Sequence, residues 1–507
     1  MVVVAPFAVQ AAETRGGLLS AHQSQTRTVT IDRSTMGWKM TEVVLIAGDG
    51  IGCEVVAVAR RVLEATRVPL TFIDAVAGEQ IFATGNATGV PQETIDEICR
   101  VKLVLKGPLG TQLTSGGKSA NVTLRKMFEM YANIRPIKSW PAVEAHWDDV
   151  DLVIVRENIE DLYAGIEHRQ SRDVFQSLKV ISRPGCDRIN KMAFEYAQRT
   201  NRAKVACATK ANIMKFTEGT MKTSFETLAL TYPDIAARHV LVDDCAHQLA
   251  KNPHQFDVIV TTNMNGDILS DLAAGLVGGL GLAPSANIGA DCAMFEAVHG
   301  TAPDIAGLGM ANPTAEILAA AMMLEHLGYI PEALAVRNAV AAALRSGAKT
   351  RDLGGLMSTS EYADAVIGHL VLPDTVSTPT VPATVRLQPT AEMGTQPCVV
   401  EDVGVDVFLE HDGSIAELVQ NSARVANIAG LKLVMVENRG TCMFPTRPVS
   451  QMELSDVSRC RFMLDTTDDL DSAICTLLLR LRARWVHIER LRTFDGVPGF
   501  SKAQGEP

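Results

Sequence analysis

The sequence lacks three features that would place a chain of 507 residues in other protein classes. Its formal net charge of −11 argues against nucleic-acid binding, because phosphate recognition needs a clustered positive surface. Its ten cysteines form no CxxC pair, so we interpret them as reduced thiols rather than a disulfide framework or a zinc site. No apolar run reaches the roughly 18 residues that a membrane span requires. What remains is the composition of a globular protein, long enough for about three domains.

Residues 1–40 differ from the rest of the chain. They carry four basic and two acidic residues among many Ser and Thr. The apolar start MVVVAPFAV has no basic residue ahead of it, which argues against a secretory signal. We expect a disordered leader in a cytoplasmic protein. The alternatives are a transit peptide, with location in the mitochondrial matrix, or a true start at Met36 or Met40.

Short apolar runs alternate with helix-period segments from Glu42 to about residue 370. The runs have the length and β-branched content of buried strands, and stretches such as EVVAVARRVLEAT between them have helical periodicity. This alternation predicts an α/β fold with a largely parallel sheet that is covered on both faces. The expected strands lie in EVVLIAGDGIG and LTFIDAVAG and at 101–107, 151–157, 203–210, 238–244 and 256–262.

The composition changes after residue 370. Residues 371–400 are rich in Pro and Thr, which predicts a linker. The segment 401–500 then has the order βαββαβ, which predicts an α+β domain of the ferredoxin-like type. It contains no cluster of acids or histidines and no glycine-rich phosphate loop, so we interpret it as an assembly or regulatory module.

A glycine turn near the first expected strand is similar to a dinucleotide-binding fingerprint without completing it. In GDGIGCE, Gly48 and Gly50 have the required spacing, but Cys53 stands where the motif G-x-G-x-x-G needs its third glycine. The simpler interpretation is a tight turn between a strand and a helix, with a ligand bound near it.

Three arginines form the first group of residues that indicates chemistry. Arg125 and Arg135 lie in the segment SGGKSANVTLRKMFEMYANIRPIK, and Arg156 follows in DLVIVRE. Each guanidinium can hold one carboxylate through paired hydrogen bonds, which suits a substrate with several carboxylates. The alternative is a solvated basic surface.

Three aspartates form the second group. Asp267 and Asp271 follow the strand FDVIV at the i, i+4 spacing of one helix face, and Asp243 closes the expected strand RHVLVD. Carboxylate oxygens of this kind suit Mg²⁺ or Mn²⁺ with positions left for substrate oxygens. For Asp267 alone, stabilisation of a helix N-terminus is the alternative.

Six motifs in order over residues 42–370 resemble the isocitrate/isopropylmalate dehydrogenase family. They are SANVTLR, ANIRP, VRENIEDLYAGIEH, TKANIMKFTEG, NMNGDILSDLAAGLVGGLGLAPSANIG and FEAVHGTAPDIAGLGMANPTAEILAAAMML. The resemblance implies a cofactor-binding large domain from residues 41–130 and 279–370. It implies a small domain from residues 131–278 that carries the dimer interface and the metal site. The C-terminal unit is similar to the extra domain of longer members.

The resemblance also assigns roles. Lys210 and Asp243 are implied to reach the active site of the neighbouring subunit, so the partner is a second copy of the chain in a homodimer. Lys210 is also expected to lower the pKa of Tyr163 by its charge. The implied positions are Tyr163 (general acid) and Lys210 (catalytic lysine); Ser119, Asn121, Arg125, Arg135 and Arg156 (substrate); Asp243, Asp267 and Asp271 (metal); and His299, Gly300, Thr301, Ala302, Asp304, Ile305 and Asn312 (cofactor).

Two segments indicate the substrate and the cofactor within that family. Ser119 and Asn121 resemble the S-x-N of isocitrate users, which implies oxidative decarboxylation of isocitrate to 2-oxoglutarate; homoisocitrate and 3-isopropylmalate are the alternatives. Asp304 and Ile305 stand where NADP users carry Lys and Tyr, so the expected cofactor is NAD. A different class, a non-catalytic regulatory subunit, is disfavoured because Tyr163 and Lys210 are present.

Overall fold

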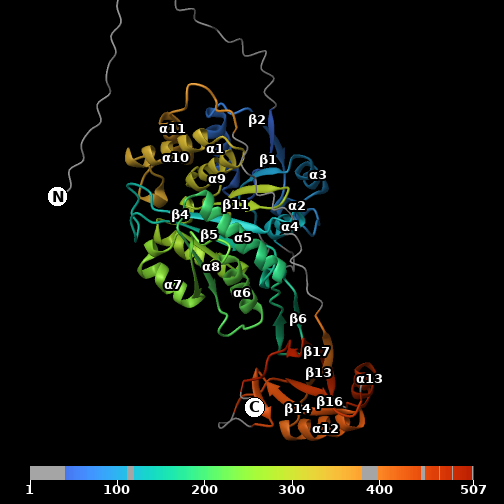
Figure 1. Cartoon of the computed structure of the whole chain (residues 1–507). Helices are drawn as coiled ribbons and strands as arrows, with labels where there is room; N and C mark the ends of the chain where they lie inside the picture. The colour runs from blue at the N-terminus through green and yellow to red at the C-terminus, as the bar shows by residue number, and fades with distance from the viewer. Residues whose placement is uncertain are drawn as a thin grey trace, which may run out of the picture. The chain divides into compact units, whose positions relative to one another are not determined.

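A computed structural model describes residues 40–110, 119–379, 398–446, 452–467, 469–481, 483–504 and 506 (Figure 1). The predicted leader lies outside the described residues except for Met40, as do residues 380–397 of the predicted linker. No helix in the described ranges combines the length and apolar character needed to cross a bilayer.

A ten-stranded sheet forms the centre of the region before the linker. The sheet contains two blocks of four parallel strands, with β11 and β4 between them. The strands β11 and β4 are antiparallel to each other, β11 is antiparallel to its other neighbour β12, and β4 is antiparallel to its other neighbour β5. The predicted strands and the largely parallel α/β fold are confirmed, whereas β4, β11 and β12 were not predicted. In spatial order the strands are β2 (Leu70–Ala75), β1 (Thr41–Ile46), β3 (Leu103–Lys106), β12 (Ala293–Ala297), β11 (Pro284–Ile288), β4 (Ala132–Lys138), β5 (Asp151–Glu157), β10 (Val258–Thr261), β8 (Lys204–Thr209) and β9 (Ala236–Leu241).

Helices connect and cover these strands. The sheet was predicted to be buried on both faces, and its strands β3, β5, β8 and β10 are almost entirely buried. A short two-stranded ribbon, β6 (Glu167–Arg169) with β7 (Phe175–Ser177), lies apart from the main sheet. The helices are α1 (Gly52–Ala65), α2 (Glu79–Ala83), α3 (Gln92–Val101), α4 (Ala120–Met127), α5 (Arg183–Arg199), α6 (Thr217–Ala229), α7 (Val242–Lys251), α8 (Asn263–Leu276), α9 (Thr314–His326), α10 (Ile330–Arg345) and α11 (Thr359–Gly368).

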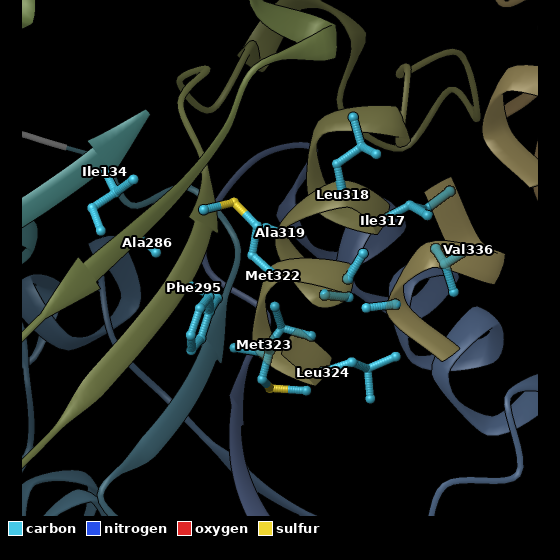
Figure 2. Close-up of a cluster of buried hydrophobic side chains, with 14 of the residues drawn as sticks. Ile134, Ala286, Phe295, Ile317, Leu318, Ala319, Met322, Met323, Leu324 and Val336 are labelled. Atoms are coloured by element: carbon cyan, nitrogen blue, oxygen red, sulfur yellow. The ribbon is translucent and has the colours of Figure 1, made fainter. Parts of the chain in front are cut away.

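Helix α9 is the centre of the largest hydrophobic core. Its residues from Thr314 to Leu324 are all buried, so it lacks the polar face of a surface helix. Figure 2 shows Met322 on the side of α9 that faces the strands carrying Ile134 and Phe295, with Val336 of α10 on another side. This core joins strands of both expected domains, so the division at residues 131 and 278 stays a prediction.

The C-terminal unit has its own sheet and its own core. The first strand, β13, lies between β16 and β17, and β16 pairs in turn with β14, all antiparallel. This arrangement with two helices confirms the predicted ferredoxin-like domain, to which β15 and β18 add short edge strands. The elements are β13 (Val400–Glu410), α12 (Ile415–Ile428), β14 (Leu431–Asn438), β15 (Thr441–Phe444), β16 (Val457–Leu464), α13 (Leu470–Arg480), β17 (Arg484–Phe494) and β18 (Val497–Pro498).

A buried ion pair links β3 to β12. Lys106 and Glu296 are register partners in the parallel ladder, and Lys106 Nζ lies 2.6 Å from Glu296 Oε2. Their side chains are 0% and 5% exposed. Burial opposes the charge of Glu296, but Lys106 and Arg125 outweigh it and hold the pKa of Glu296 far below its usual range. A buried pair of this kind makes the loss of either partner costly.

We predict that Glu296→Gln lowers the free energy of unfolding by about 3–5 kcal/mol, because the Lys106 ammonium would stay buried without its counterion. Urea unfolding followed by circular dichroism measures the change. Glu42→Gln is the matched control, since it breaks an exposed pair with Arg100 and should cost less than about 1 kcal/mol. Equal losses in the two variants would contradict the prediction.

Glu316 is a second buried carboxyl group, on α9. Its Oε2 accepts a hydrogen bond from the backbone N–H of Ala297 at 2.9 Å, and its Oε1 has no partner among the described residues. Burial raises the pKa of Glu316 to about 8. Between the ordinary pKa of a glutamate and pH 8 the folded chain therefore holds a proton that the unfolded chain has lost, so this group makes stability fall as pH rises.

We predict that Glu316→Gln flattens this pH dependence, because a neutral amide can accept the same hydrogen bond without titrating. The melting temperature of the variant should exceed that of the wild type by a few degrees at pH 8, and the gain should vanish near pH 4.5. Calorimetry across this range gives the measurement. A constant offset between the two curves would show that Glu316 does not titrate in this window.

Candidate active site on helix α8

Asp267 and Asp271 lie on one face of α8, as predicted, beside two buried arginines. Arg156 Nη1 lies 2.5 Å from Asp267 Oδ1, and Arg135 Nη1 lies 3.2 Å from both Asp267 Oδ1 and Asp271 Oδ1. The hydroxyl group of Tyr163 donates to Asp267 Oδ2 at 2.5 Å. The structure therefore brings together five of the predicted site residues.

Close packing fixes Arg156 against α8. A Cβ atom at Gly266 would lie 2.6 Å from Cγ of Arg156, so only glycine leaves room for the arginine there. Arg156 also donates from Nε and Nη2 to Asn263 Oδ1, at 3.1 and 2.8 Å. Arg156 therefore extends from β5, and the first turn of α8 binds its guanidinium group.

Burial and neighbouring charges shift the pKa values of Asp267, Asp271 and Tyr163. Burial favours protonation of Asp267, but Arg156 and Arg135 outweigh it and lower the pKa of Asp267. The pKa of Asp271 is raised, because burial exceeds the effect of Arg135. The pKa of Tyr163 is raised by burial and by its hydrogen bond to Asp267, so its hydroxyl group keeps its proton at neutral pH. The expectation that Lys210 of a second copy lowers this pKa stays a prediction, because within the single chain Lys210 pairs with Asp243.

The predicted substrate residues of α4 lie next to the Lys106–Glu296 pair. Arg125 Nη2 donates to Glu296 Oε1 at 2.9 Å. Asn121 Oδ1 and Arg125 Nε are buried and have no hydrogen-bond partner among the described residues. Unpaired buried polar atoms are costly, so their positions suit a bound polar group. Ser119 is the residue before α4, at its N-cap.

Lys210 and Asp243 form a separate pair. Lys210 Nζ lies 2.6 Å from Asp243 Oδ1, and the Asp243 side chain is 63% exposed. The prediction that Asp243 closes a strand is wrong, because β9 ends at Leu241 and Asp243 stands in the first turn of α7. No group of three acidic, His or Cys side chains that could hold a metal forms within the described ranges of one chain.

The donors present nevertheless fit a hard divalent cation. Asp267 and Asp271 stand one helical turn apart and turn their carboxylates to the same side, where both contact Arg135. Two carboxylates with open positions are a usual basis for Mg²⁺ or Mn²⁺ binding.

The predicted cofactor residues follow β12 and lead to α9. The Thr301 carbonyl accepts from the N–H of Ile51 at 2.9 Å, and a Cβ atom at Gly50 would lie 2.0 Å from that carbonyl oxygen. The glycine turn therefore packs on this loop instead of forming a complete fingerprint. Asn312 Oδ1 accepts from the N–H of Thr314 at 3.0 Å, at the start of α9, and Asn312 Nδ2 donates to Asp352 at 2.9 Å.

The remaining residues of this loop have different surroundings. Burial lowers the pKa of His299, and its Nε2 has no partner among the described residues. Ala302 has a positive φ of 39°, which starts the 3₁₀ turn Pro303–Ile305. Gly300 and Asp304 are exposed.

Several residues around Arg125 and Arg156 were not predicted from the sequence. Lys106, Glu296 and Asn263 were not predicted, although a lysine in the apolar run VKLVLKG and a glutamate in the run AMFEAV were visible signals. Asp161, Lys179 and Glu218 were missed as well. They form a buried ion cluster between the Tyr163 turn and the Lys210 turn.

Three similar known proteins match this chain over nearly all of its length. It is 48% identical over 477 residues to the isocitrate dehydrogenase [NADP] of Thermus thermophilus, covering 92% of this chain and 96% of that one. It is 38% identical over 482 residues to the isocitrate dehydrogenase [NADP] of Rickettsia prowazekii, covering 92% and 99%. The crystal structure of the TT0538 protein from Thermus thermophilus matches with a TM-score of 0.86 at 47% identity, covering 92% of this chain and 96% of that one.

These relatives overturn the prediction of NAD as the cofactor. The proteins from Thermus thermophilus and Rickettsia prowazekii that are named isocitrate dehydrogenase both carry NADP in that name, so an NAD-dependent enzyme is not supported. The prediction rested on Asp304 and Ile305, which stand where NADP users carry Lys and Tyr, and on the repulsion expected between the Asp304 carboxylate and a 2′-phosphate. Asp304 is exposed in the 3₁₀ turn Pro303–Ile305, where water screens its charge, so this carboxylate alone is a weak basis for discrimination.

Two family models match the chain. The bacterial isocitrate dehydrogenase C-terminal domain matches residues 400–506, which are the ferredoxin-like unit. The isocitrate/isopropylmalate dehydrogenase model matches residues 42–366, which carry the ten-stranded sheet and the residues around α8. The chain therefore belongs to the isocitrate/isopropylmalate dehydrogenase family.

Proposed function

We propose that the chain catalyses the metal-dependent oxidative decarboxylation of isocitrate to 2-oxoglutarate and carbon dioxide, with NADP as the oxidant. The observation that carries the proposal is the meeting of Arg135, Arg156 and Tyr163 at Asp267, one turn from Asp271. Cations for carboxylates, a phenol that keeps its proton and two metal-binding carboxylates are what this reaction needs.

The arginines bind and orient the substrate. Arg135 and Arg156 are buried, with Nη1 atoms that a substrate carboxylate can share with Asp267. Arg125 and Asn121 each have one unpartnered buried polar atom at the end of the site near α4. An isocitrate carboxylate bound there can accept a hydrogen bond from Arg125 Nε, with Ser119 and Asn121 as its neighbours.

Asp267 and Asp271 would hold Mg²⁺ or Mn²⁺, which would supply Lewis acidity at the substrate hydroxyl group, and NADP would supply a hydride acceptor for C2. Tyr163 then donates its phenolic proton to C3 after carbon dioxide leaves. Its raised pKa keeps it protonated for that step. Lys210 of a second copy of the chain restores the proton of Tyr163.

The test is a steady-state assay of the purified chain with isocitrate, homoisocitrate and 3-isopropylmalate, each with NADP or NAD. We expect isocitrate with NADP to have the highest kcat/KM, by roughly tenfold or more over NAD, which is about 1.4 kcal/mol of differential binding. Higher kcat/KM with another acid would reassign the substrate. Absence of turnover in the folded chain would favour a regulatory subunit.

Asp271→Asn should weaken metal binding by at least about tenfold, because one of two carboxylate ligands on α8 becomes a neutral amide. Titration of Mn²⁺ into the metal-free protein, followed by electron paramagnetic resonance, measures binding independently of turnover. Asp244→Asn is the control, since Asp244 is exposed on α7 next to Asp243 and has no proposed role. Equal Mn²⁺ affinity of both variants would remove Asp271 from the metal site.

We also propose a homodimer with shared active sites, because Lys210 and Asp243 pair away from the Tyr163–Asp267 group. Inactive Lys210→Met chains mixed with inactive Tyr163→Phe chains should recover activity, since one site of each hybrid would contain both residues. Mass spectrometry verifies subunit exchange. If exchanged hybrids stay inactive, each site is built within one chain.

A further inference from the structure

A buried ion cluster lies between the turn that carries Tyr163 and the turn that carries Lys210. Lys179 Nζ lies 2.5 Å from Asp161 Oδ1 and 2.8 Å from Glu218 Oε1. Both carboxylates are fully buried, and the lysine side chain is 13% exposed. Two carboxylates in such surroundings need a cation, and here one ammonium group serves both.

Asp161 fixes the Tyr163 turn to α8. Its Oδ1 accepts from the N–H of Leu162 at 2.8 Å, and its Oδ2 accepts from the N–H of Met264 in the first turn of α8 at 3.0 Å. The residue has a positive φ of 69°, a conformation that costs a non-glycine residue energy and that these bonds hold in place. The direction in which Tyr163 leaves this turn therefore depends on the Asp161 carboxylate.

Glu218 fixes the Lys210 turn in the same way. Its Oε2 accepts from the backbone N–H of Lys210 at 3.0 Å, and its Oε1 accepts from Thr262 Oγ1 at 3.2 Å. The Lys210 side chain then extends to Asp243, whereas the Tyr163 hydroxyl group extends to Asp267. One cluster thus orients two groups that point in different directions.

We infer that Lys179 is a positioning residue that orients both the general acid of one active site and the lysine delivered to the other. This inference rests on the proposed function and on the shared sites proposed with it. Tyr163 would serve the chain's own site and Lys210 that of the second copy. A single change at Lys179 would then slow both sites of a dimer, including the site whose Tyr163 comes from an unchanged chain.

Hybrid dimers separate the two effects. In a dimer of one wild-type chain and one chain with Tyr163→Phe and Lys179→Met, the only working site takes Lys210 from the altered chain. In a dimer of one wild-type chain and one chain with Lys210→Met and Lys179→Met, the working site takes Tyr163 from the altered chain. The reference hybrids carry Tyr163→Phe or Lys210→Met alone.

We expect both test hybrids to have a kcat roughly tenfold or more below their references, because small misplacements of reacting groups have effects of this size. The KM for isocitrate should change little, since Arg135 and Arg156 are not bonded to the cluster, and the pH profile of kcat should shift. Lys179→Arg should restore part of the activity. Lys222→Met, on the same helix as Glu218 and paired with exposed Glu226, is the control without effect.

A fall in only one hybrid would limit Lys179 to one turn, and an unchanged kcat in both would overturn the inference. If chains with Lys179→Met do not fold, Glu218→Gln replaces that change in the first hybrid and Asp161→Asn in the second, with the same expectations. Wild-type turnover of isocitrate and rescue in the mixed single variants are measured first. They show whether a negative result concerns Lys179 or the proposed function itself.

Discussion

The site depends on one constraint: guanidinium groups buried between a sheet and a helix need an anion at a fixed place. Arg135 and Arg156 are 4% and 1% exposed, and both reach Asp267. A lone cation in such surroundings would be strongly destabilising, so the carboxylate holds the arginines as much as they hold it. Gly266 allows the helix to come close enough for this contact. The same carboxylate also accepts a hydrogen bond from the Tyr163 hydroxyl group. The two arginines and the tyrosine are therefore all positioned by contact with Asp267.

The same principle recurs around this centre. Lys106 and Arg125 share Glu296, and Lys179 is shared by Asp161 and Glu218. Each cluster joins segments distant in the sequence, such as β3 with β12 or the Tyr163 turn with α6. Apolar contacts could join them as firmly, but directional charged contacts also specify which atoms face each other. For a site that must present several polar groups within about half an ångström, that specificity is the advantage.

Local pattern predicted those parts of the molecule that depend on local geometry. The i, i+4 spacing places Asp267 and Asp271 on one helix face wherever α8 packs, and the apolar runs become strands in any α/β sheet. The strands β11 and β12 were missed because PSANI and AMFEA are short and carry polar residues that are buried only by their neighbours. Lys106 and Glu296 could not be paired from sequence, since about 190 residues separate them. The cofactor was predicted wrongly from two adjacent loop positions, Asp304 and Ile305, of which Asp304 is exposed to solvent.

The place of β12 in the sheet has a consequence for synthesis of the chain. The strands β2, β1 and β3 are complete once residue 106 has been made, but the neighbour of β3 on the other side begins only at Ala293. Until then β3 presents an open edge of unpaired backbone groups, and open edges are where chains associate wrongly. Its partner must emerge from the ribosome about 190 residues later. Slow elongation across residues 107–292 would therefore prolong the interval in which nascent chains can pair through β3, and a chaperone that covers this edge would act in that interval.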